Sequence, residues 1–184
     1  VDENGNWTPE NTTWEPLERD EHVVARFAMS ADLHYGAGVY YPEAKLEAIY
    51  NAIDQIGGVD MFAISGDVTD HGHADELRGV MNIIKAHTSD PVSEVDGVTV
   101  TGTGDDVTTT LLCMGNHEYK TDGVNSETTF SGITGQDVCG LYWINGVPVI
   151  KMSPTSSEEG NSYYGREEFI LRAFEEIDNS GYDG

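Results

Sequence analysis

Three short apolar runs along the chain each end in a turn that carries acidic, amide or histidine side chains. The runs span residues 23–30, 61–65 and 110–114, and their length is typical of buried strands rather than of helices. In open α/β sheets, ligands bind in the crevice at the carboxyl ends of the strands. The pattern therefore predicts that the turns after these three strands contribute to one site.

A helical pattern of apolar residues occurs in each of the two intervals between these strands and again near the end of the chain. Apolar positions recur at helical spacing over residues 42–56, 73–87 and 166–177. Pro42 suits the first turn of the first helix, and the glycine pair after residue 56 gives that helix a natural end. The predicted buried face of the last helix consists of Phe169, Ile170, Ala173, Phe174 and Ile177.

A hairpin is predicted where the apolar runs at residues 141–144 and 147–150 flank Asn145-Gly146, the strongest short hairpin signal. Residues 89–106 are rich in glycine, aspartate and threonine, and we expect an excursion there that can hold another hairpin. Alternating strands and helices favour an α/β layered domain over residues 21–184. Residues 1–20 are polar and aperiodic, which indicates an amino-terminal arm or linker.

The side chains after the three strands form a mixed set of oxygen and nitrogen donors. Asp32 and His34 are two residues apart, so at a strand end both can point to the same side and chelate one metal ion. Asp67 can offer one carboxylate oxygen to each of two ions, and Asn116 can add a carbonyl oxygen to the second. Such a set favours manganese, iron or zinc over calcium, which takes oxygen ligands.

These residues lie in three motifs, which are Asp32-Leu33-His34, Gly66-Asp67-Val68-Thr69-Asp70 and Gly115-Asn116-His117-Glu118. The motifs D-x-H, G-D-x-x-D and G-N-H-E occur in this order in the calcineurin-like metallophosphoesterases, and over roughly residues 27–152 the chain resembles that superfamily. The resemblance implies a four-layer αββα sandwich, with two mixed sheets packed together and helices outside. It also implies hydrolysis of a phosphate monoester or diester by metal-activated water.

The resemblance implies a dinuclear metal centre. Asp32 and His34 would bind one ion, Asn116 would bind the other, and Asp67 would bridge them. The two ions would be divalent or trivalent, with manganese, iron or zinc expected. In such a centre the ions lie ~3.5–4 Å apart, lower the pKa of a bound water and stabilise both the attacking and leaving oxygens.

Two further motif residues are expected to act in catalysis without binding metal. In the resembled family, the histidine that corresponds to His117 lies near the substrate phosphate, where it can donate a proton or stabilise charge. Asp70 would orient a metal ligand such as His34 from outside the coordination shell.

The resemblance is incomplete toward the carboxyl terminus. The family completes its site with a later histidine and a Gly-His-x-His motif, yet no histidine follows His117 in this chain. We therefore expect a domain truncated at its carboxyl terminus, whose metal site a missing segment or a second chain would complete. The alternative is a non-catalytic phosphoesterase-fold domain used for binding or scaffolding.

The acidity of the chain limits its partners. Among 184 residues, 33 are acidic and 9 are basic, which gives a formal net charge of −24. Nucleic acids and anionic membranes are therefore disfavoured as partners, and a small phosphate ester is the expected substrate. No apolar run approaches the ~20 residues of a membrane-spanning helix.

Location and redox state are less constrained by the sequence. The valine start, the Trp- and Pro-containing arm and the acidity favour a secreted or cell-surface protein over a cytoplasmic one. Cys113 and Cys139 are far apart along the chain, and the sequence leaves open whether they pair.

The remaining histidines carry weaker signals. His71 and His73 lie just beyond the second motif, and we expect surface residues of a turn and a helix start rather than metal ligands. His22 and His87 have no neighbours at metal-ligand spacing and are expected to face solvent.

Overall fold

The computed structural model describes residues 16–18, 21–88, 93–95, 98–100, 109–121, 126–155 and 162–184. The predicted arm lies outside the described residues except for 16–18, as does most of the excursion over residues 89–106. Among the helices of the described part, none is long and apolar enough to cross a membrane.

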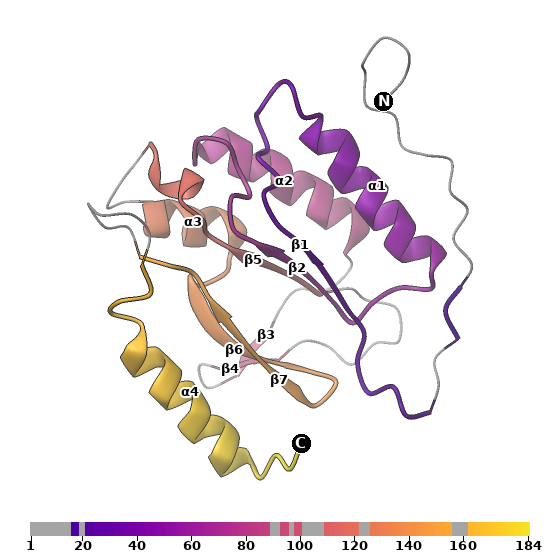
Figure 1. The fold of residues 1–184 in the computed structure, drawn as a ribbon, viewed down its shortest axis with the longest axis vertical. Coiled ribbons are helices and arrows are strands. Elements are labelled where there is room, and N and C mark those ends of the chain that lie inside the picture. The colour runs from indigo at the N-terminus through magenta and orange to yellow at the C-terminus, as the bar shows by residue number, and fades with distance from the viewer. Residues whose placement is uncertain are drawn as a thin grey trace.

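A parallel three-stranded sheet lies at the centre of the domain (Figure 1). Its strands, in spatial order, are β1 (Phe27–Ser30), β2 (Met61–Ser65) and β5 (Thr109–Cys113). One face is covered by α1 (Pro42–Gln55), α2 (Ala74–His87) and α3 (Ser126–Thr134). Because the strands are parallel, their carboxyl ends lie at the same edge of the sheet.

A second sheet faces the other side of the first, with the strand order β3-β4-β6-β7. Its strands are β3 (Ser93–Val95), β4 (Val98–Val100), β6 (Cys139–Ile144) and β7 (Val147–Met152). β3 and β4 are antiparallel, so the excursion does hold a hairpin. β6 and β7 pair across Asn145 and Gly146, whose φ angles of 49° and 79° are those that a tight hairpin turn requires.

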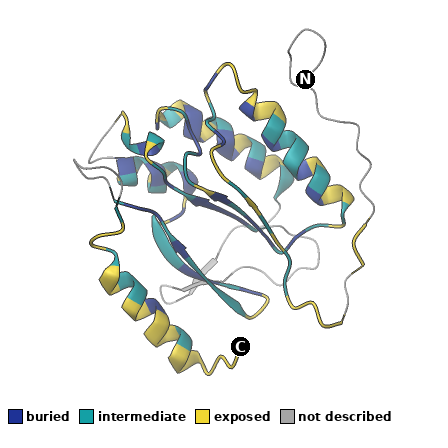
Figure 2. Ribbon diagram, in the orientation of Figure 1, coloured by how far each residue is buried: buried dark blue, intermediate teal, exposed yellow. Residues whose placement is uncertain are grey.

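Two hydrophobic clusters fix the layers. Phe62 and Ile64 of β2 pack toward the helices, whereas Met61 of β2 packs with Tyr142 and Ile144 of β6 between the two sheets. Side chains alternate along a strand, so β2 supplies both clusters. Helix α4 (Glu167–Ser180) lies outside the second sheet, and buried residues concentrate in the inner layers (Figure 2). The four-layer αββα prediction is confirmed, although among the described strands only the second sheet is mixed and the first is parallel.

The first strand is shorter and more exposed than predicted. β1 begins at Phe27 instead of residue 23, and the N–H of Arg26 donates to the Asp60 carboxylate at 2.5 Å rather than to a neighbouring strand. Phe27 and Met29 are 45% and 72% exposed. β1 is an edge strand, and the cluster between the sheets contains none of its residues, which explains why this face of β1 remains open.

The two later helices also depart from the sequence analysis. In α4 only Ala173 is buried and Phe174 is 54% exposed, so the predicted buried face is wrong in extent. Among the described residues, the main contact of α4 is with β7. No apolar stripe predicts α3, because its sequence is mostly serine, threonine and glycine around the buried Phe130.

His87 lies against the core rather than facing solvent as expected. Its side chain is 15% exposed, its ring stacks on Tyr50 at 4.7 Å, and its Nε2 lies 2.8 Å from Glu47 Oε2. The partner residues come from α1, so this histidine ties the end of α2 to α1. His22 is 84% exposed at its side chain, as predicted.

A buried lysine joins the second sheet to the edge of the first. Lys151 of β7 is 3% exposed, and its Nζ donates to Gln136 Oε1 at 3.1 Å and lies over the ring of Phe130 at 5.7 Å. The Gln136 side chain also bonds to the backbone N–H and C=O of β5, which would otherwise be an open edge. Burial lowers the pKa of Lys151 to about 8 from 10.5, because desolvation disfavours the charged ammonium.

Replacing Lys151 by methionine is expected to stabilise the protein at pH 7 and to flatten its pH profile. A lysine with a lowered folded-state pKa contributes stability above pH 10.5 that is lost as pH falls through about 8. From pH 10.5 to pH 7 the wild type should therefore lose up to ~3 kcal/mol of unfolding free energy relative to K151M. Urea unfolding at both pH values measures this difference, with the exposed Lys85→Met as control. An equal pH dependence in wild type and K151M would contradict the prediction.

The two cysteines lie near Lys151. Cys113 and Cys139 are both free thiols, so they form no disulfide with each other. Burial raises the pKa of each thiol, with the Cys113 thiol on the face of the first sheet that meets the second. Both are consequently neutral thiols near pH 7 and neither belongs to a candidate metal cluster among the described residues.

Candidate functional site

The three motifs meet at the carboxyl edge of the central sheet. The parallel pairing of β1 and β2 continues beyond both strands, because the N–H of Asp32 donates to the carbonyl of Gly66 at 3.1 Å. The N–H of His34 likewise donates to the carbonyl of Asp67 at 2.9 Å. These backbone bonds hold the first two motifs side by side.

The backbone at three of the predicted ligands is left-handed. Asp32, His34 and Asp67 have φ angles of 53°, 49° and 48°. For a residue other than glycine, this conformation costs on the order of 1 kcal/mol or more, and it occurs preferentially at functional sites. Nothing in the residue types predicts this conformation at His34, so it is a finding of the structure.

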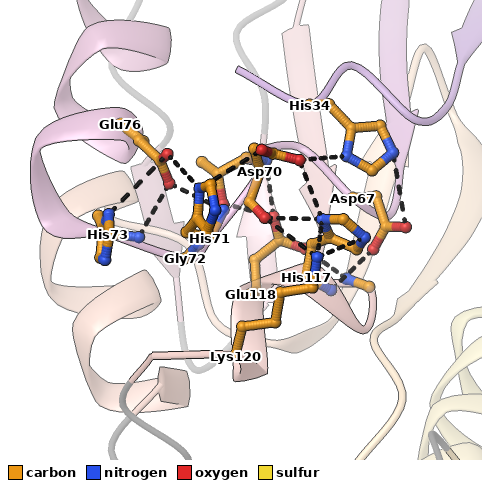
Figure 3. A network of polar contacts seen from close by, with 12 residues as sticks. His34, Asp67, Asp70, His71, Gly72, His73, Glu76, His117, Glu118 and Lys120 are labelled. Carbon is orange, nitrogen blue, oxygen red and sulfur yellow. Dashed lines mark hydrogen bonds and ion pairs between the residues drawn. The ribbon is translucent and has the colours of Figure 1, made fainter. Parts of the chain in front are cut away.

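Asp67 lies between the first and third motifs (Figure 3). Its Oδ2 is 4.0 Å from His34 Nε2, and its Oδ1 accepts the backbone N–H of His117 at 3.0 Å. The rings of His34 and His117 meet edge to face, with centroids 4.2 Å apart. One ligand atom from each of these three residues lies within 4.8 Å of the others, so the trio can surround a single ion.

Asp70 contacts both histidines of this trio. Its Oδ1 lies 3.1 Å from His34 Nδ1 and 3.3 Å from His117 Nδ1. Burial by itself would raise the pKa of Asp70, but the hydrogen bond from His34 and the charges of His71 and His117 lower it below its ordinary value. Asp70 is thus a carboxylate placed behind His34, on the side away from Asp67.

Asp32 and Asn116 lie beside the trio rather than within it. Both are exposed, and together with Asp67 they line a pocket of about 250 Å³ at the strand ends. Pro154 and Tyr163, from the segment between β7 and α4, form another wall. The structure therefore brings the four predicted metal ligands to one edge of the sheet, with Asp67 shared by the trio and the pocket.

Glu118 fixes the second and third motifs relative to each other, a role that the sequence analysis missed. The side chain is 2% exposed. Its Oε1 accepts the N–H and the hydroxyl of Thr69 at 2.7 and 2.8 Å, and its Oε2 accepts the N–H of Gly115 at 2.6 Å. Burial raises the pKa of Glu118, and these donors oppose the shift. The sequence signal was its place at the end of the third motif.

Gly115 allows the third motif to approach Asp67 closely. A Cβ atom at residue 115 would collide with the Asp67 carboxylate and with its backbone nitrogen. Lys120, also missed by the sequence analysis, brings a positive charge to the same place, with Nζ 2.8 Å from His117 Nε2 and 3.4 Å from the carbonyl of Asp70. The site thus combines carboxylates, imidazoles and one ammonium.

His71 and His73 are partly exposed, as expected of a turn and a helix start. His73 caps α2, and both imidazoles lie near the Glu76 carboxylate, which is a grouping that the sequence analysis did not anticipate.

This arrangement defines an α/β domain with a candidate metal site at the ends of parallel strands. Residues 25–177 match the family model described as calcineurin-like phosphoesterase, and the chain belongs to that family. This match confirms the resemblance drawn from the three motifs. No curated protein matches the chain. Membership of this family indicates metal-dependent phosphoester hydrolysis as the general activity.

The donors at the site fit the metals that such a family uses. His34 and Asp67 supply an imidazole nitrogen and a carboxylate oxygen 4.0 Å apart, and Asp32 and Asn116 add oxygens at the pocket. Mixed nitrogen and oxygen donors suit manganese, iron and zinc. The individual roles of these residues remain predictions.

Proposed function

We propose that this chain carries a dinuclear centre that hydrolyses a small phosphate monoester or diester. Asp32 and His34 would hold one ion, Asn116 the other, and Asp67 would bridge them. The observation that carries the proposal is the position of Asp67, which faces His34 on one side and lines the pocket with Asp32 and Asn116 on the other. When bound, the metal ions would supply an activated water and would stabilise phosphoryl charge.

The chain's own residues support proton transfer at His117. Its Nδ1 lies 2.7 Å from the Asp70 carbonyl, which can only accept a hydrogen bond, and 2.7 Å from the Lys120 Nζ, which can only donate one. We infer that Nδ1 donates to the carbonyl, so that Nε2 would gain or release the transferred proton. Protonated, it would donate to the leaving oxygen of the ester, while the nearby Lys120 ammonium would offset negative charge on the phosphoryl group.

The coordination shells need more ligands than these residues provide. No histidine follows His117, whereas the motifs resembled here are completed in the family by later histidines. We propose that another polypeptide segment or a second chain supplies them. The net charge of −24 supports a small phosphate ester as the substrate over nucleic acid, whose phosphates attract basic surfaces.

The same shortage of ligands favours one second candidate function. A phosphoesterase-fold domain with an incomplete shell would bind metal or a phosphate group without turnover and would serve as a binding or scaffolding module. The two functions differ in whether bound metal supports hydrolysis.

Metal removal and reloading test the proposed activity. Dialysis against a chelator is expected to abolish hydrolysis of p-nitrophenyl phosphate and bis(p-nitrophenyl) phosphate, and Mn²⁺, Fe²⁺ or Zn²⁺ is expected to restore it. Calcium should restore little, because the site contains imidazole ligands. Hydrolysis that persists at full rate after chelation would contradict a metal-dependent reaction, and reloaded protein that binds metal without turnover would favour the binding module.

A further inference from the structure

A second group of metal-ligating side chains lies beside the proposed centre, at the start of α2. It consists of His71, His73 and Glu76, which lie to one side of the Asp70 and His117 cluster in Figure 3. The two imidazoles are about half exposed, at 52% and 49%, whereas the Glu76 side chain is 10% exposed. The Glu76 carboxylate is therefore buried, and the two imidazoles face solvent.

The Glu76 carboxylate is fixed by the backbone. Its Oε2 accepts the N–H of His71 at 3.0 Å and the N–H of His73 at 3.1 Å. Its Oε1 packs against Gly36, where any Cβ atom would collide with it. The carboxylate thus has two hydrogen bonds on one oxygen and a close backbone contact on the other, and it is held in one orientation.

The second oxygen of Glu76 faces the two imidazoles. Oε1 lies 3.2 Å from His71 Nδ1 and 4.0 Å from His73 Nδ1. The two rings are stacked, with centroids 5.4 Å apart and planes 14° from parallel. The capping box explains the bonds to Oε2 and places the His73 side chain at the Glu76 N–H, but it does not require the His71 imidazole to lie at Oε1.

From this geometry we propose that His71, His73 and Glu76 bind one transition-metal ion of the zinc class, separate from the centre around Asp67. Ligand atoms of the three residues lie within 4.8 Å of one another. Zinc binds such nitrogens and oxygens at ~2.0–2.2 Å, in a site that three protein ligands and a water can complete. Because the imidazoles are half exposed, small ring rotations suffice to close the shell on an ion, with water at the open side.

Zinc binding to defined variants tests this site. The double variant H71Q/H73Q is expected to bind one Zn²⁺ per chain fewer than the wild type, measured by elemental analysis after equilibrium dialysis. H73Q alone should lower the affinity for this ion by more than the ~10–100-fold that loss of a residue outside the coordination shell causes. His22→Gln, which alters an 84% exposed histidine far along the chain, is the matched control and should bind as the wild type does.

The same ion should persist when the neighbouring centre is disabled. Asp67→Asn is expected to retain a Zn²⁺ ion whose binding shifts the imidazole proton signals of His71 and His73 in NMR spectra. These signals are also measured in wild-type protein, so the test does not depend on the folding of the double variant. Equal zinc content in wild type and H71Q/H73Q, or unshifted signals of both histidines at saturating Zn²⁺, would overturn the proposal. Neither outcome depends on hydrolytic activity, so the proposed function is tested separately.

Discussion

Asp67→Asn is expected to lower metal-dependent phosphoester hydrolysis by at least about 100-fold. Even the loss of a residue outside a coordination shell lowers metal affinity or activity by ~10–100-fold, and Asp67 is a proposed ligand. An amide oxygen can bind one ion weakly but cannot serve as a charged bridge between two. The fold should survive, because the new amide oxygen can still accept the His117 N–H that Asp67 Oδ1 accepts at 3.0 Å. Asparagine also tolerates the left-handed backbone at this position, where φ is 48°.

The matched control for this substitution is Asp178→Asn on α4, which removes the same charge from an exposed position. Hydrolysis of bis(p-nitrophenyl) phosphate at fixed Mn²⁺ gives kcat and KM for each variant. A rate in Asp67→Asn within a few-fold of the wild type, with Asp178→Asn unchanged, would remove Asp67 from the reaction and with it the proposed bridge.

Glu118→Ala is expected to give the largest loss of stability, about 3–5 kcal/mol of unfolding free energy. The buried carboxylate accepts three hydrogen bonds, from Gly115 and from two groups of Thr69, and its removal leaves these donors without their acceptor. A cavity forms as well, since the side chain is 2% exposed. Because Glu118 joins the second and third motifs, metal binding should weaken together with stability.

Glu118→Gln separates shape from charge at the same position. Its amide nitrogen must face one of the backbone N–H donors, so the variant should lose less than Glu118→Ala but still ~1–3 kcal/mol. Urea unfolding of both variants, beside the exposed Glu175→Ala on α4, measures these differences. Wild-type stability in Glu118→Ala would show that the contacts of Glu118 do not hold the two motifs together.

Local patterns predicted much of the fold. The apolar runs and helical stripes place β2, β5, α1 and α2 within a few residues of where they lie, because those elements bury one or both faces. Asn145-Gly146 predicted the β6–β7 hairpin for a local reason, since both residues must adopt positive φ in such a turn.

The errors in the fold arose where burial depends on distant partners. Phe174 belongs to a regular apolar stripe, yet β7 is the main described contact of α4 and leaves it exposed. His87 has no sequence neighbour that reveals its stacking on Tyr50, some 37 positions earlier. Such contacts follow from tertiary packing and cannot be predicted from periodicity.

At the site, residue types were predictable and geometry was not. The three motifs predicted that Asp32, His34, Asp67 and Asn116 would gather, since parallel strands end at one edge. The motifs did not indicate the left-handed backbone of His34 or the bonds that Glu118 makes. Both are properties of loops held side by side, which only the assembled sheet defines.

The most direct test of the central claim is the manganese content of the wild type and of Asp67→Asn after loading and desalting, with electron paramagnetic resonance on the same samples. Mn²⁺ is chosen because it favours oxygen-rich sites over the histidine group at the start of α2. We predict exchange-coupled Mn²⁺ pairs in the wild type, and loss of the coupled signal and of at least one ion per chain in Asp67→Asn. Equal manganese content and identical uncoupled spectra in the two proteins would contradict a metal centre built around Asp67.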